Sequence, residues 1–197
     1  EQGLRESENL SDDDMEIFSK RKQLKKFSDK VPSKELVQQI LKKTFELTPS
    51  KQNMMPYSVH VFDHTHTKEK DNLYELSTHS NCYHNHQLKA PYVLLLQPRE
   101  VYVTEHMKSE LFASKGGKLN VTSSDVDVEI GMFATIFTGL CLEYDIDVSY
   151  TKCLPSNEYT MAISIGYRIP DKVYKDTRHI KPKVDDVIKW VDSPDSQ

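Results

Sequence analysis

Basic residues near the N-terminus are the feature of this sequence most able to do chemistry. Residues 6–16 are strongly acidic, whereas residues 20–30 carry six basic side chains: Lys20, Arg21, Lys22, Lys25, Lys26 and Lys30. Guanidinium and ammonium groups donate charge-assisted hydrogen bonds to phosphate and carboxylate oxygens. The group is therefore a candidate anion site. The alternative is one solvated amphipathic helix, whose acidic start and basic end suit the helix dipole.

Histidines form a second candidate, a metal site. They fall into two groups: His60, His64 and His66, and then His79, Cys82, His84 and His86. Neither group has a zinc-type spacing with paired cysteines, and the sequence has no HExxH helix. We therefore expect no metal.

Other common reaction centres lack their motifs. The sequence has no GxSxG, GxGxxG or P-loop, and its paired carboxylates lie only in the acidic lead and at Asp185–Asp186. A net charge of −4 gives no reason to expect nucleic-acid binding. No apolar run approaches the roughly 20 residues that would span a membrane. Hydrolysis, nucleotide triphosphate chemistry, nucleic-acid binding and membrane insertion are all disfavoured.

Three cysteines, Cys82, Cys141 and Cys153, are widely spaced and form no CxxC pair. We expect free thiols, as is usual in a reducing compartment. No charged-then-apolar leader opens the sequence, so we expect a cytoplasmic protein.

Helices and strands in mixed order must position any site. We expect one domain over residues 15–197 after an acidic lead at 1–14, with a lid at about 97–124 and a C-terminal arm at about 168–197. Apolar periodicity predicts helices after the N-capping Ser33 and at about 68–78 and 126–144. Strands are predicted at about 57–62, 92–97, 146–150 and 159–165. No βαβ unit repeats, which indicates an α+β fold.

The predicted helix at 126–144 is apolar on nearly every face. Such a helix must be buried all round. In so small a domain, pairing with its copy in a second subunit would provide that cover.

Three ordered motifs, with this helix between the second and the third, make the chain resemble the nitroreductase family of flavin oxidoreductases. The motifs are Arg21–Pro32, then Pro49-Ser50-Lys51-Gln52-Asn53 up to Tyr57, and Ala162–Tyr167 followed by Arg178. The resemblance covers roughly residues 15–192. It implies an intertwined α+β homodimer with a central, mostly antiparallel sheet flanked by helices and two FMN sites at the subunit boundary.

The resemblance also implies which residues hold FMN. Arg21, Lys22 and Arg178 are candidates for the phosphate, with Gln23 as a neutral donor. Lys25 maps to the cation near the N1 and O2 edge of the flavin. For Lys26 we prefer a solvated surface charge.

Further contacts to the flavin are implied from other parts of the chain. Pro49, Ser50 and Asn53 would reach it from the neighbouring subunit, although Ser50 equally suits a simple turn. Asn85 lies where relatives place a polar contact to the ring. Relatives carry glycines in the turn after the penultimate strand, whose backbone N–H approaches flavin N5. This chain has Tyr150–Cys153 there, so Thr151 or Lys152 would have to donate.

The implied reaction is ping-pong. NAD(P)H would deliver hydride to FMN and be replaced by a small acceptor, such as a nitroaromatic or a quinone. The lid at about 97–124 would set the choice of acceptor, with Tyr102 and Phe112 as its candidate residues. No side chain need act as acid or base. The alternative is a catalytically weak FMN-binding or dimerisation protein, because the glycines of the turn are missing.

Overall fold

The computed structural model describes residues 16–79, 85–101, 122–154, 158–172 and 182–188. Within these ranges no helix has the length and apolar character needed to cross a membrane. Most of the expected lid, including Tyr102 and Phe112, lies outside the described residues.

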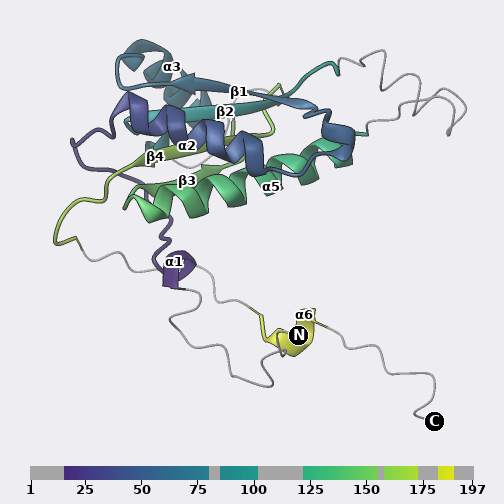
Figure 1. Cartoon of the computed structure of the whole chain (residues 1–197). Coiled ribbons are helices and arrows are strands. Elements are labelled where there is room, and N and C mark those ends of the chain that lie inside the picture. The colour runs from purple at the N-terminus through teal and green to yellow at the C-terminus, as the bar shows by residue number, and fades with distance from the viewer. Residues whose placement is uncertain (1–15, 80–84, 102–121, 155–157, 173–181, 189–197) are drawn as a thin grey trace, which may run out of the picture.

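A four-stranded antiparallel sheet forms the centre of the domain (Figure 1). Its strands are β1 (Tyr57–Phe62), β2 (Tyr92–Pro98), β3 (Asp147–Thr151) and β4 (Met161–Gly166), in the order β1-β2-β4-β3. Every pair is antiparallel. The predicted α+β class and antiparallel sheet are therefore confirmed, and each predicted strand is found within two residues of its expected ends.

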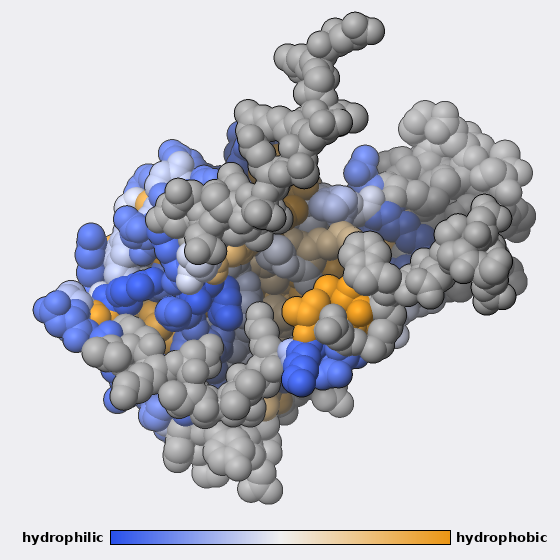
Figure 2. All heavy atoms as spheres, turned by 90° about the horizontal axis from the view of Figure 1, so that it is seen from below, coloured by the Kyte–Doolittle hydropathy of each residue, from blue (hydrophilic) through white to orange (hydrophobic). Residues whose placement is uncertain are grey.

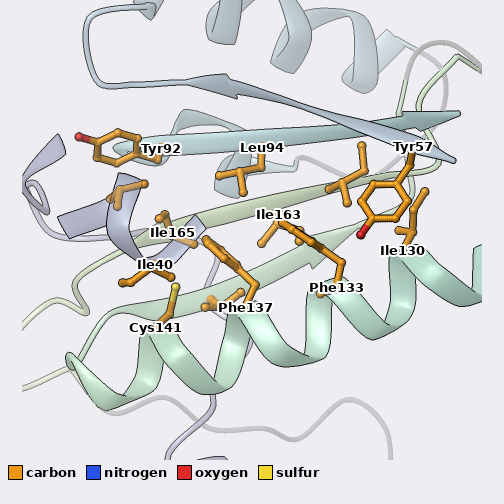
Figure 3. Close-up of a cluster of buried hydrophobic side chains, with 14 of the residues drawn as sticks. Ile40, Tyr57, Tyr92, Leu94, Ile130, Phe133, Phe137, Cys141, Ile163 and Ile165 are labelled. Carbon is orange, nitrogen blue, oxygen red and sulfur yellow. The ribbon is translucent and has the colours of Figure 1, made fainter. Parts of the chain in front are cut away.

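Two long helices cover one face of the sheet (Figure 1). The first, α2 (Lys34–Leu47), begins at Ser33, whose side chain accepts a hydrogen bond from the backbone N–H of Leu36. The second, α5 (Ser123–Glu143), begins with a capping box between Thr122 and Asp125. Their apolar residues pack against the strands in one continuous core (Figure 3).

A smaller core lies on the opposite face, under α3 (Thr67–His79) and the 3-10 helix η3 (His86–Lys89). Gly166 ends β4 at a close contact. A Cβ atom there would lie 2.9 Å from the Pro91 ring and 3.0 Å from the Phe27 ring. The glycine therefore allows the basic segment to pack against the sheet.

The expectation of one amphipathic helix running through the basic residues is wrong. The described helix α1 covers only Glu16–Ser19, and residues 21–30 are not helical. The reason is tertiary: this segment bonds to the sheet. The backbone N–H of Leu24 donates to the Ser149 hydroxyl at 2.6 Å, and that of Ser28 donates to the Tyr167 carbonyl at 2.8 Å.

Part of α5 remains uncovered within the single chain, so the helix is not buried all round by its own fold. Val128 is 56% exposed, Met132 is 41% exposed, and a side chain at Gly131 would meet nothing within 4 Å. These residues share one helical stripe. Figure 2, which views the molecule from below Figure 1, shows hydrophobic surface between hydrophilic areas. The short helix α6 (Val184–Val187) is also exposed.

Candidate functional site

Residues 21–24 lie along the outer edge of β3. The Gln23 side chain donates to the Tyr150 carbonyl at 2.7 Å and accepts from the Tyr150 backbone N–H at 3.2 Å. Leu24 is fully buried and donates to Ser149. Since β3 is an edge strand, its backbone groups are available for such pairing. The first motif is therefore fixed to the sheet by Gln23 and Leu24.

Arg21 is held beside Tyr150 by this pairing. Its guanidinium carbon lies 5.9 Å from the centroid of the Tyr150 ring. The Nη1 atom of Arg21 is buried and has no hydrogen-bond partner among the described residues. A buried donor without an acceptor is costly, and a charged one more so. Arg21 thus offers an open, charged donor, which is the group that an anion requires.

The neighbouring basic residues differ in exposure. Lys22 is half-buried, whereas Lys25 and Lys26 are exposed. Gln23 uses its carbonyl oxygen and one of its N–H bonds on Tyr150, so one N–H remains for another acceptor. Arg178, the third predicted phosphate ligand, lies outside the described residues.

Asn85 precedes η3 in the sequence but lies in space beside the turn that follows β3. Its amide N–H donates to the Cys153 carbonyl at 3.0 Å, and its amide oxygen accepts from Gln87 at 3.3 Å. The structure thus brings Asn85 close to the Thr151–Cys153 turn, although they are far apart in sequence. Asn85 is buried, so its visible contacts fix the turn.

The turn itself forms without glycine. Cys153 donates its backbone N–H to the Thr151 hydroxyl, and Leu154 donates to the Lys152 carbonyl at 2.9 Å. None of residues 151–154 has a positive φ. Non-glycine residues can therefore adopt this backbone without the strain that missing glycines would otherwise cause.

Tyr150 connects this corner to α5. Its hydroxyl hydrogen-bonds the hydroxyl of Thr138 and donates to the Ala134 carbonyl at 3.2 Å. Burial is the main cause that raises the pKa of Tyr150 above its usual value. The ring beneath Arg21 is therefore fixed in place and neutral at ordinary pH.

The second motif follows α2 and is anchored on the first half of α5. Its 3-10 turn, η2 (Lys51–Asn53), starts after Ser50, whose hydroxyl accepts from the Met55 backbone N–H at 2.7 Å. The Lys51 side chain pairs with Asp125 at 3.1 Å. Pro49 is exposed, and Asn53 is exposed with a left-handed φ of 55°. Asn53 therefore faces outward, while Ser50 stabilises the turn.

Glu129 is a residue of this region that the sequence analysis missed. It is 5% exposed, and its Oε1 accepts from the Lys51 backbone N–H at 2.8 Å. Its Oε2 is buried and accepts no hydrogen bond from a described residue. Burial chiefly, and the charge of Glu129 in addition, raise the pKa of the nearby Tyr57, whose hydroxyl points toward α5 in Figure 3. The available signal was an acidic residue at helical spacing from the apolar residues Val126, Ile130 and Phe133.

The histidines do not form a metal centre in the described part of the chain, where no group of three potential ligands comes together. His60 contacts Ser58, and His66 contacts Asp63 at 2.9 Å. Cys82 and His84 lie outside the described residues.

Comparison with known proteins relates this arrangement to one group of structures. No family model matches the chain, and no curated protein matches it in sequence. Solved structures do match. A nitroreductase-like protein from Streptococcus mutans superposes with a TM-score of 0.65 at 15% identity, over 92% of this chain and 99% of that chain.

Two further structures agree. A candidate nitroreductase in complex with FMN from Exiguobacterium sibiricum gives a TM-score of 0.65 at 17% identity, over 90% of this chain and 96% of that chain. A candidate NAD(P)H:FMN oxidoreductase from Staphylococcus epidermidis gives 0.68 at 18%, over 96% of this chain and all of that chain. The chain therefore has the nitroreductase-like fold.

Proposed function

We propose that this chain binds FMN and acts as an NAD(P)H-dependent oxidoreductase that reduces a small acceptor of the nitroaromatic or quinone type. The observation that carries the proposal is the buried, unpartnered Nη1 of Arg21 beside Tyr150. Its support is the shared fold, because one structure with this fold is an FMN complex and another is named as an NAD(P)H:FMN oxidoreductase.

The chain's own residues would bind and orient the cofactor. Arg21 would hold the phosphate with Lys22 and Arg178, and the remaining N–H of Gln23 would add a neutral donor. Lys25 would stand near the pyrimidine edge of the flavin. When bound, FMN supplies hydride transfer between NAD(P)H and the acceptor in two half-reactions.

The turn after β3 would present a backbone N–H, from Thr151 or Lys152, to the flavin. Asn85 holds this turn through the Cys153 carbonyl, so we assign it a positioning role in addition to the predicted ring contact. Because the turn forms with negative φ values, the absence of glycine does not strain its backbone.

A homodimer would complete the site. Asn53 and Pro49 face outward on a turn that Glu129 and Asp125 hold rigid. Glu129 and Asp125 belong to α5, which also carries the uncovered apolar stripe with Val128 and Met132. If that stripe is buried against a second copy of the chain, residues 49–53 of each subunit would come close to the flavin site of the other subunit. We place the activity in the cytosol, where the Cys141 thiol would stay reduced.

Colour and bleaching test the proposal. The purified protein, reconstituted with FMN, should be yellow and should bleach anaerobically when NADPH or NADH is added. A second candidate function, FMN binding with little catalysis, is favoured by the absence of glycine at 151–153. It predicts a yellow protein that does not bleach. A protein that stays colourless and gains no thermal stability from excess FMN would contradict both.

A further inference from the structure

A cavity of about 470 Å³ lies between the segment 26–29, the start of α3 and the turn that leads into β2. The residues that carry the argument are Lys26, Ser28, Lys70, Asp71 and Lys89. Pro91 also lines the cavity, and the next residue, Tyr92, pairs with Ile165 of β4. Ile165 in turn pairs with Val148, near the start of β3. Thr151 ends β3 four residues from its start, about 14 Å along the strand. The cavity is thus separate from the corner that holds Arg21.

Lys70 is the central group of this cavity. It is 5% exposed, and its ammonium group donates to the Ala90 carbonyl at 2.8 Å and to the Pro91 carbonyl at 3.2 Å. An ammonium group has three N–H donors, so one remains. No described carboxylate forms an ion pair with Lys70, although Asp63 and Asp71 act on it electrostatically. Burial lowers the pKa of Lys70, as expected for a cation taken out of water.

Holding two carbonyl groups would by itself explain one buried lysine, but the cavity gathers more donors. Lys89 pairs with Asp71 at 3.0 Å and lies 4.3 Å from the Tyr74 ring centroid, which fixes its position. Lys26 adds a third ammonium group. The Ser28 hydroxyl oxygen is buried and has no partner in the part of the chain that the structure describes. Lys70 therefore has one N–H donor left over, and the Ser28 hydroxyl has no described partner; together they favour an acceptor-rich ligand in this cavity.

Charge and size indicate the class of ligand. Three lysines line the cavity against two carboxylates, Asp29 and Asp71, so the lining is positive when His64 and His86 are neutral. A volume of 470 Å³ fits a small molecule. We propose that this cavity binds a small phosphate-bearing anion, with Lys70 and Ser28 at its buried end and Lys26 and Lys89 at its exposed end. The proposal does not depend on FMN binding.

Inorganic phosphate is the probe for this site. The full chain is titrated with phosphate by calorimetry, and the site is located by backbone amide shifts of Ser28, Lys70 and Ala90 in NMR spectra. We expect saturable binding with a Kd of about 1 mM or tighter. The double variant Lys26→Gln/Lys89→Gln removes only exposed charges, so it should fold normally and lose roughly tenfold or more in affinity, a loss in the range of one charged hydrogen bond.

Two control variants make the result specific. Lys68→Gln removes an exposed lysine of α3 outside the cavity and should leave the affinity unchanged. Arg21→Gln should also leave it unchanged, which separates this cavity from the proposed flavin phosphate site. The proposal is overturned if phosphate does not bind, if the double variant binds as the unaltered chain does, or if Arg21→Gln abolishes binding.

Discussion

Replacing Gln23 with Ala should detach the basic segment from β3. The substitution removes two hydrogen bonds, of 2.7 and 3.2 Å, to the backbone of Tyr150. Each such bond contributes about 0.5–1.5 kcal/mol net. Because Gln23 is exposed and water can replace it, we expect the free energy of unfolding to fall by about 1–2 kcal/mol.

The same change should weaken FMN binding, because Arg21 is oriented by the docked segment. Affinity falls with the fraction of molecules in which the segment is docked. A loss of 1–2 kcal/mol therefore lowers the apparent FMN affinity by at most roughly 5- to 30-fold. Urea denaturation measures the first effect, and quenching of FMN fluorescence measures the second.

A matched control is Gln39→Ala, which alters an exposed glutamine on α2. Its effect on the free energy of unfolding should stay within about 0.5 kcal/mol. If Gln23→Ala matches this control in both stability and FMN affinity, the docking of the segment through Gln23 is refuted.

Three further predictions concern the exposed stripe of α5, the buried tyrosines and the capping box of α5. Met132→Glu places a charge on the apolar stripe of α5 and should convert a dimer to a monomer in light-scattering chromatography. Glu143→Gln, at the exposed end of α5, should leave the dimer intact. A dimeric Met132→Glu variant would contradict the α5 interface. Burial raises the pKa values of Tyr57 and Tyr150, so their contribution to stability is complete below about pH 10, the unfolded value, and is lost as the pH rises further. The free energy of unfolding of the Tyr150→Phe variant should therefore fall less steeply above pH 10. An unchanged dependence of unfolding on pH would refute this. Hydrogen bonds from Thr122, followed by one from Lys51, lower the pKa of Asp125 to about 2. Its contribution to stability is therefore present above about pH 4 and is lost as the pH falls toward 2. The free energy of unfolding of Asp125→Asn should fall less steeply between pH 4 and pH 2, and an equally steep fall would count against the capping box.

The elements that the sequence predicted well are those with local signals. Ser33 caps α2 through its own side chain, and the apolar run at 92–97 has the length and composition of a buried strand. The long apolar pattern of α5 likewise needs no knowledge of distant residues. Such features depend on residues within one or two turns of each other.

The parts that were missed depend on distant partners. The charge pattern of residues 20–30 suited a helix, but Leu24 and Gln23 bond to a strand about 125 residues away. Glu129 supports Lys51 across 78 residues, and Asn85 supports Cys153 across 68. No local periodicity encodes these pairings, although the apolar Leu24 and Phe27 within a basic segment were a visible sign that it packs against the core.

The affinity of the Arg21→Met variant for FMN tests the central proposal most directly. A charged hydrogen bond to phosphate contributes about 1.5–3 kcal/mol, so FMN should bind roughly 10- to 100-fold more weakly, with little change in unfolding by urea. Lys42→Met, at an exposed position on α2, should bind FMN as the unaltered chain does. Equal FMN affinity in the Arg21 variant and the unaltered chain would contradict the assignment of this corner as the flavin site.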